Sequence, residues 1–490
     1  MCPSTRTNYI MPKVTSPDGV QIVQRHNITS SKPESCSDLG PIFRLGPLDQ
    51  LVLTFIPVAV VYIYTASPSS TTIPIDKLCQ ATSLVLDTYP HLTGRIGINE
   101  DHGGAHIHSL GTGCEILEAV CDKSLEDLGK GNVVGLMELP GKGEDLMAPY
   151  DFKNVKMEDQ VVSTIQHTRF ACGGVALGIR ILHCLNDGAG FFHLVRDLTS
   201  IYRSLDNPEA GTIQALAPPY LSNYENEASE EEKERNRLYE PVLYHLEPNT
   251  AVELAAPDIP APASVQEKPK ITGQVLHFSN SDLDTLKRLA TPKERYVTTF
   301  DALTAHLQQR IYQARHRTYE SNPSLGTLGE ADLLCPIDLR SHLNLEKDGI
   351  YPYNAVLTTS ATFSPEILTD NTKLPEVASK VHKMVRPLGD GDAEATVKWI
   401  STVDRSKIRH GYKGGTGGVM VSQWNKMDMY DGGVFETRPV LVAPPFTPIS
   451  LHDGLGYTIQ TESGNGIDVY LALREEVWGQ LDVGVSTGSR

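Results

Sequence analysis

The sequence predicts an α/β protein with two domains, and three observations support this fold class. The chain has 490 residues, which is enough for two or three domains with substantial cores. Runs with the alternation of β-strands and runs with the three- and four-residue spacing of helices are mixed along it. Near the middle, the composition changes to a charged and then proline-rich stretch of the kind that connects domains.

This change of composition sets the predicted domain boundaries. Residues 225–237 form a charge run, and a Pro/Ala-rich stretch containing Pro257, Pro260, Pro262 and Pro269 follows it. Such a segment cannot easily bury a core, so we expect it to cross the surface between two domains. The predicted parts are an N-terminal domain over 1–215, a crossover linker over 216–270 and a C-terminal domain over 271–490.

The first half starts with a strand and a helix. The apolar run Leu51–Tyr64 is too short to span a bilayer and indicates a buried strand. A helical pattern over Ile75–Tyr89 ends before Pro90. Residues 160–182 then predict two consecutive strands, joined through Cys172-Gly173-Gly174.

The end of this second strand is the most informative part of the sequence. Residues 175–182 alternate as on a strand, and His183 follows at its terminus. The pair Asp187-Gly188 indicates a sharp turn, and the apolar residues within 191–201 have helical spacing. A histidine held at a strand end can serve as a fixed general base. The alternative is a core histidine followed by an aspartate in a turn.

The second half continues the mixed pattern. A strand is predicted at Gln274–Phe278, and strands dominate again from Val419 onward. Three segments between them have helical spacing, namely Ser281–Ala290, Thr299–Arg315 and Pro375–Leu388.

Composition excludes several classes of protein. The formal net charge is −17, which argues against a general nucleic-acid binder because phosphate affinity comes from clustered Lys and Arg. The eight cysteines form no CxxC pair and no zinc-type spacing, so we expect reduced thiols in the cytoplasm and no metal. Residues 1–29 lack the apolar core of a signal peptide, and we expect no membrane insertion.

Several motifs resemble those of one family, in the same order. The segment Gln166–Gly174 leading into His183–Gly188 resembles the HxxxD region of the BAHD acyltransferases, which transfer acyl groups from acyl-CoA to alcohols or amines. The resemblance covers about residues 40–480. Its other motif-like segments are Leu48-Asp49-Gln50, Thr298–His306, Ile337–Ser341 followed by Tyr353-Asn354-Ala355, and Val421–Trp424.

One family motif is degenerate. The DFGWG sequence should fall at Gly433–Thr437, where glycine stands in place of the aspartate. In the family this loop lies away from the catalytic histidine and is considered structural. With its plain HxxxD, the chain is similar to fungal members of secondary metabolism more than to typical plant members.

The resemblance implies a fold and a reaction. The fold would be two chloramphenicol-acetyltransferase-like domains, each a mixed β-sheet flanked by helices, joined by a long crossover, with the site in a tunnel between them. The reaction would move an acyl group from acyl-CoA to a hydroxyl of a small metabolite, with an amine as the weaker alternative. His183 would be the base, acyl-CoA a co-substrate without any permanently bound cofactor, and the protein a monomer.

The resemblance also implies roles around His183. Asp187 and Gly188 would orient the loop that carries the histidine, with Arg295 as the candidate partner of Asp187. Ser422 and Trp424 would line the region of the tetrahedral intermediate, where the hydroxyl and the indole N–H are suitable donors. The alternative for Trp424 is an aromatic anchor in the core.

The phosphates of CoA require cations inside an acidic protein. Arg405, Lys407, Arg409 and Lys413 run into the glycine-rich segment 414–418, whose backbone amides would help to bind them. The alternative is a solvated surface loop.

Two rival functions remain open at this point. The donor can be a carrier-protein thioester, as in the related condensation domains, and turnover with free acyl-CoA would separate the two. The chain can also be a scaffold of this type that only binds a ligand or catalyses a non-acyl reaction such as a cyclisation. Activity that survives His183→Ala would favour this second rival.

Overall fold

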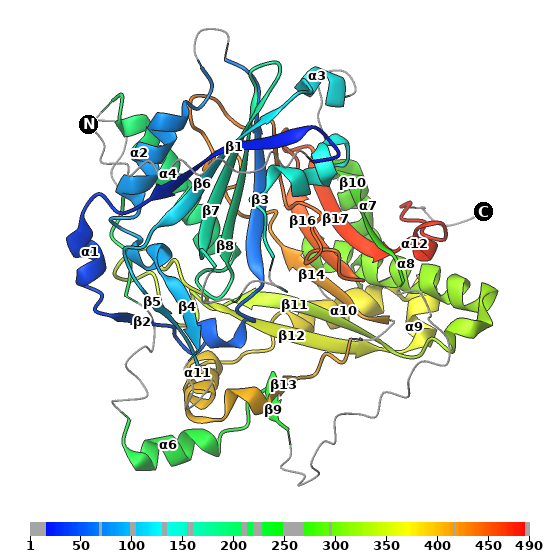
Figure 1. Cartoon of the computed structure of the whole chain (residues 1–490). Coiled ribbons are helices and arrows are strands. Elements are labelled where there is room, and N and C mark those ends of the chain that lie inside the picture. The colour runs from blue at the N-terminus through cyan, green and yellow to red at the C-terminus, as the bar shows by residue number, and fades with distance from the viewer. Residues whose placement is uncertain are drawn as a thin grey trace.

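Two six-stranded sheets organise the chain in the computed structural model (Figure 1). The ranges that the structure describes are 16–67, 71–98, 104–129, 135–151, 153, 156, 160–207, 213–218, 228–247, 269–293, 296–414 and 417–485.

The first sheet has the strand order β1-β6-β7-β8-β3-β15. It is mixed, because β6 and β7 are parallel while the other neighbours are antiparallel. The apolar side chains of its strands and of helices α2 and α4, which pack together, form one core. The bounds are β1 Val20–Ile28, β3 Pro57–Tyr64, β6 Cys114–Cys121, β7 Ser163–Phe170, β8 Val175–Leu182, β15 Leu441–Ala443, α2 Ile75–Val85 and α4 Gly188–Ser204.

The second sheet has the strand order β10-β17-β16-β14-β11-β12. It is mixed as well, because β14 runs parallel to both of its neighbours. Helices α7, α8 and α10 pack against one another and share a second core with this sheet. The bounds are β10 Ile271–Ser279, β11 Ala331–Asp338, β12 Val356–Phe363, β14 Val419–Gln423, β16 Leu455–Gln460, β17 Gly466–Arg474, α7 Asn280–Ala290, α8 Thr299–Ser321 and α10 Leu374–Met384.

Shorter elements surround the two sheets. Two small sheets contain β2 Ile42–Arg44, β5 Ala105–His108 and β4 Arg95–Ile98, and β9 Tyr244–Leu246 with β13 Ile408–His410. The short helices are α1 Pro33–Ser37, α3 Leu125–Leu128, α6 Glu230–Arg237, α9 Pro365–Thr369, α11 Asp392–Thr402 and α12 Glu475–Trp478. The 3₁₀ segments are η1 Asp49–Leu51, η2 Pro90–Thr93, η3 Leu136–Glu138, η4 Pro140–Leu146, η6 Pro323–Leu325, η7 Asn371–Lys373 and η8 Arg405–Lys407.

One strand crosses between the halves. β15 follows β14 in the sequence, yet it pairs antiparallel with β3 of the first sheet, with Leu441 opposite Ile63 and Ala443 opposite Val61. The C-terminal part of the chain therefore contributes an edge strand to the N-terminal sheet. The domain boundaries at 215 and 270 stay a prediction. In addition, strand β15 from the C-terminal part belongs to the N-terminal sheet.

The predicted α/β class, with a mixed sheet and flanking helices in each half, is confirmed. One local prediction was wrong. The strand expected over Leu51–Tyr64 begins only at Pro57, because the preceding residues form the turn η1 and a loop. The charge run contains the helix α6, which starts with a capping box at Ser229 and Glu232. Within the described ranges, no helix combines the length and apolar character that crossing a bilayer requires.

Candidate active site

His183 lies directly after strand β8, at the centre of the first sheet. β8 pairs with β3 on one side and β7 on the other, and all of its residues are buried. The backbone N–H of His183 donates to the carbonyl of Ile56 at 2.7 Å, which extends this pairing beyond the strand. The histidine itself is half-buried. It is therefore mounted on a rigid element while part of its surface stays accessible.

The ring of His183 contacts an amide from the second half of the chain. Its Nδ1 lies 3.1 Å from Oδ1 of Asn354, which is fully buried. Nδ2 of Asn354 donates to the backbone carbonyl of His183 at 2.8 Å and to the carboxylate of Asp49 at 2.9 Å. Because both of these partners accept, the amide turns its oxygen toward the ring. Neutral His183 then carries its proton on Nδ1 and keeps a lone pair on Nε2.

Asp187 fixes the turn between β8 and α4. As N-cap of α4 it accepts the backbone N–H of Gly190 at 3.0 Å, and it accepts the N–H of Ala355 at 2.9 Å. Arg340 donates to both of its carboxylate oxygens, at 2.8 and 2.9 Å. Burial opposes ionisation of Asp187, but Arg340 and the two amides outweigh it and lower the pKa of the carboxyl. Asp187 therefore positions the loop through partners other than the His183 ring.

Arg340 connects this turn to the second half. Its guanidinium donates to the carbonyls of Tyr351 and Tyr353 and to Asp338 at 3.2 Å, besides its two bonds to Asp187. Burial would lower the pKa of Arg340, but the carboxylates of Asp187 and Asp338 raise it. Removing one member of such a buried pair typically destabilises a protein by about 3–5 kcal/mol.

Trp424 packs over the start of α4. Its ring lies 4.7 Å from that of Tyr457 and 5.7 Å from that of Phe192, and it is 7% exposed. A Cβ at Gly188 would lie 3.3 Å from the indole Nε1, so glycine allows this close approach. Ser422 is half-buried on β14, beside Tyr457 of β16. The indole N–H therefore lies next to the loop that carries His183.

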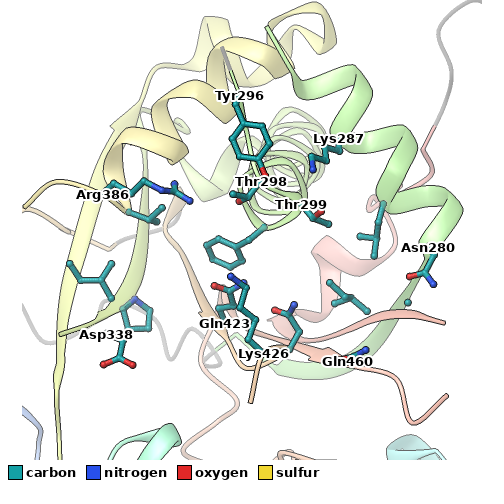
Figure 2. A pocket seen from close by; sticks show the side chains of 18 of the residues that line it. Asn280, Lys287, Tyr296, Thr298, Thr299, Asp338, Arg386, Gln423, Lys426 and Gln460 are labelled. Atoms are coloured by element: carbon teal, nitrogen blue, oxygen red, sulfur yellow. The ribbon is translucent and has the colours of Figure 1, made fainter. Parts of the chain in front are cut away.

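A cavity of about 650 Å³ opens in the second half. Its lining includes three cationic side chains: Lys287 on α7, Arg386 after α10 and Lys426 after β14. Figure 2 shows Tyr296 between Lys287 and Arg386 at one side of the opening. The first residues of α8, the end of β11 with Asp338, and residues between Gln460 and Ile467 also line it, as does Gln423, the neighbour of Ser422. His183 itself does not line this cavity.

The sequence match decides the family. Residues 19–480 match the model of the Transferase family. The chain belongs to the Transferase family. The resemblance to the BAHD acyltransferases is confirmed, and so is the enzyme class, an acyl-CoA-dependent O-acyltransferase.

Individual relatives are distant but span most of the chain. Over 412 residues it is 26% identical to a hydroxycinnamoyl-CoA:piscidic acid hydroxycinnamoyltransferase of Actaea racemosa, covering 80% of this chain and 84% of that protein. Over 362 residues it is 24% identical to the acyltransferase GLAUCE of Arabidopsis thaliana, covering 72% and 71%. The structure of vinorine synthase is similar with a TM-score of 0.65 at 18% identity, covering 95% and 97%. That of F. graminearum TRI101 complexed with coenzyme A and T-2 mycotoxin is similar with a TM-score of 0.62 at 18% identity, covering 90% and 96%.

The partner expected for Asp187 in this family member was Arg295, which lies outside the described residues. Among the residues described, the arginine against Asp187 is Arg340. The sequence did contain a signal, because Asp338-x-Arg340 resembles a family motif, but no role followed from it. Asp49 and Asn354 were missed in the same way: each lies in a motif-like segment, and only the fold brings them to His183.

The basic cluster that was expected to bind CoA, at residues 405–413, lies outside this cavity. None of its four residues lines the cavity. Arg409 pairs with Glu247 where β13 meets β9, Lys407 lies 3.7 Å from Asp404, and the backbone of Lys413 donates to Asp332. The roles of Arg405, Lys407, Arg409 and Lys413, like those of Ser422 and Trp424, stay predictions, as do the cytoplasmic location and the monomeric state.

The degenerate loop is well anchored despite its altered sequence. Tyr64 donates to the carbonyl of Gly433 at 2.8 Å, and Arg203 donates to that of Val434. Glu436 accepts from the hydroxyl of Tyr202, a residue of α4. The loop is therefore held by side chains of the first half.

Proposed function

We propose that this enzyme transfers an acyl group from acyl-CoA to a hydroxyl of a small metabolite, in preference to an amine, with His183 as general base. The observation that carries the proposal is the orientation of the Asn354 amide. It supports a neutral His183 whose Nε2 lone pair is available at the end of β8. Such a lone pair can remove the proton of a hydroxyl while its oxygen attacks a thioester carbonyl.

The same imidazole ring then accepts the proton of the hydroxyl and returns it to the leaving group. Nε2 of His183 takes the hydroxyl proton as the new C–O bond forms, and the carbonyl oxygen becomes an oxyanion. When the C–S bond breaks, the imidazolium returns the proton to the CoA thiolate. Base catalysis of this kind contributes about 10²–10⁴ in rate. The position of Trp424 beside Gly188 supports its indole N–H, with Ser422, as a donor to the oxyanion.

The cavity in the second half suits the nucleotide end of the donor. Lys287 and Lys426 supply positive charge in a chain whose formal net charge is −17, while Arg386 is paired with the buried carboxylate of Asp301. Thr298 and Thr299 bring the N-terminus of the 23-residue helix α8 to the wall, where its first amides favour a phosphate. The rest of the bound acyl-CoA would extend past Gln423, at the end of β14, toward the loop of His183.

Turnover measurements test the proposed reaction. The protein is incubated with acetyl-CoA or an aromatic acyl-CoA and a panel of alcohols, while CoA release is recorded and products are identified by mass spectrometry. We expect acyl esters, and a fall in kcat of about 10²–10⁴ in His183→Ala. Product formation at the parental rate in this variant would contradict the role of the histidine and would favour a reaction without a histidine base.

Truncated donors test the proposed binding site. In Lys287→Ala and Lys426→Ala, we expect the KM for acetyl-CoA to rise about tenfold or more, since charge-assisted bonds to phosphate are lost. The KM for S-acetylpantetheine, which lacks the nucleotide, should stay unchanged. Arg409→Ala and Lys413→Ala serve as matched controls. A rise of KM in the controls alone would indicate that the donor binds at the 405–413 cluster. Turnover only with a carrier-bound acyl group would indicate that a carrier protein, and not CoA, is the donor.

A further inference from the structure

Asp49 is buried beneath the site and has no counterpart among the expected functional residues. It is 2% exposed and lies at the start of η1, in the segment that leads into β3. One carboxylate oxygen accepts both the backbone N–H and the side-chain amide of Asn354, at 3.1 and 2.9 Å. The other oxygen accepts the N–H of Gly46 at 2.8 Å. All three donors match the acceptor-only character of an ionised carboxylate.

The carboxylate leaves Asn354 one satisfactory orientation. If the amide flipped, its oxygen would face the carboxylate of Asp49 and the carbonyl of His183, and three acceptors would meet without a proton. The NH₂ group would then face Nδ1 of His183 and force that nitrogen to accept. The proton of the neutral ring would move to Nε2, where a base needs a lone pair.

We propose that Asp49 is a positioning residue, which fixes the Asn354 amide and thereby keeps neutral His183 in its Nδ1–H form. The proposal rests on the proposed function of His183 as base. The described hydrogen bonds of Asp49 go to Gly46 and Asn354, so it acts on the ring through Asn354. Its segment precedes β3, while Asn354 precedes β12, so the contact also ties the two halves together at the site.

The buried position of Asp49 is costly for a carboxylate. Burial raises its pKa to about 6, and the nearby carboxylate of Asp187 adds to this rise, although the bonds from Asn354 and Gly46 oppose it. Cys184 and Tyr353 are its other titratable neighbours, and the pKa of each is raised by burial and by the Asp49 charge. At neutral pH the fold therefore holds Asp49 as a buried carboxylate, although burying a neutral side chain would cost less free energy.

Substitutions at position 49 test the proposal at pH 8, where the carboxyl is ionised. In Asp49→Asn, the new NH₂ group would face the N–H of Gly46 or that of Asn354, so the side chain at position 49 holds the Asn354 amide less firmly. In this variant we expect kcat to fall about tenfold while the KM for acyl-CoA stays within twofold. In Asp49→Ala we expect kcat to fall about 100-fold. In ¹⁵N-histidine spectra, with His183→Gln used for assignment, the Nδ1–H form should lose population to the Nε2–H form.

A buried acid away from the site provides the matched control. Asp332 is 5% exposed and accepts from the backbone of Lys413 and the hydroxyl of Thr362. We expect Asp332→Asn to change melting temperature but neither kcat nor the His183 spectrum. An unchanged tautomer in both variants at position 49 would overturn the proposal. A shifted tautomer in a protein whose parent shows no acyl transfer would instead reject the proposed function and leave the positioning role standing.

Discussion

Two loops that cross between the halves are held in contrasting ways. The loop His183–Gly188 belongs to the first half, and residues of the second half bind its side chains: Arg340 bonds to the carboxylate of Asp187 and Asn354 to the ring of His183. The loop Gly433–Thr437 belongs to the second half. Residues of the first half bind its backbone at the carbonyls of Gly433 and Val434, and they also bind the side chain of Glu436.

The two kinds of anchor differ in how they depend on the sequence. A backbone carbonyl accepts a hydrogen bond whatever side chain its residue carries, so anchors of that kind tolerate substitution. A bond to the carboxylate of Asp187 or to the ring of His183 exists only with that side chain. The loop 183–188 therefore tolerates few substitutions at His183 and Asp187. The loop 433–437 is restricted only at positions whose side chains are packed or hydrogen-bonded.

Removing the charge at Arg340 should have the largest effect. Arg340→Met leaves the buried carboxylate of Asp187 without its ionic partner, so we expect the free energy of unfolding to fall by about 3–5 kcal/mol. Chemical denaturation measures this loss, and kcat should fall with it as the loop loses order. Arg438→Met is the control, because its ion pairs with Asp431 and Glu462 are exposed and worth about 1 kcal/mol or less. Equal losses in both variants would refute the strict anchoring of the first loop.

The partner of Asp187 marks a limit of prediction from the sequence. The strand, the histidine at its end and the helix that follows could be predicted because local periodicity determines them. The choice of Arg340 could not, because a single sequence does not say which of several arginines the fold brings to a buried carboxylate. Gly188 illustrates a related point: it has no positive φ, and glycine is required there by the close approach of Trp424 and Met427.

The two carboxylates near His183 should respond to pH with opposite signs. Asp49 binds its proton more tightly when folded, with a pKa of about 6 against 3.8, so its contribution is present at low pH and is lost as pH rises through 6. Asp187 has a lowered pKa, and its contribution is lost only as pH falls below the ordinary range near 4. Between pH 4.5 and 7.5 the wild type should therefore lose about 2 kcal/mol relative to Asp49→Asn.

Urea denaturation of both proteins across this pH range measures the difference. Cys184 and Tyr353 also face Asp49, but their pKa values are raised to about 12 or above, so they do not titrate in this window. A constant difference between wild type and variant would mean that burial does not raise the pKa of Asp49 into this pH range.

The cavity in the second half shows a second limit of prediction from the sequence. Lys287, Arg386 and Lys426 are far apart in the chain and become neighbours only because α7, the end of α10 and the end of β14 meet. The cluster at residues 405–413 is dense in the sequence, but near β13 its charges meet partners such as Glu247 and Asp404. Local charge density in the sequence therefore did not identify the cations that line a cavity.

Restoring the family aspartate should harm the second loop. A Cβ at Gly433 would lie 2.9 Å from the ring of Tyr62 and 3.1 Å from the carbonyl of Met429, and Tyr62 is fully buried. We expect Gly433→Asp to lower the free energy of unfolding by about 1–3 kcal/mol through overpacking, while kcat at 25 °C stays unchanged. Gly479→Ala, where a Cβ has open space, should be neutral. A more stable Gly433→Asp would show that the loop can still adopt the family arrangement.

The smallest effect is expected where the second loop does use a side chain. Tyr202→Phe removes the hydroxyl that donates to Glu436, whose other carboxylate oxygen still accepts the backbone N–H of Ile73. We expect a loss of about 1 kcal/mol and faster amide hydrogen exchange over residues 430–439, with kcat unchanged. Tyr312→Phe is the control, because it removes a comparable hydroxyl bond to the carbonyl of Gly329 in the second half and should leave that exchange unaltered. Exchange that stays slow in Tyr202→Phe would mean that backbone anchors alone hold the loop, and the contrast with the loop of His183 would become sharper still.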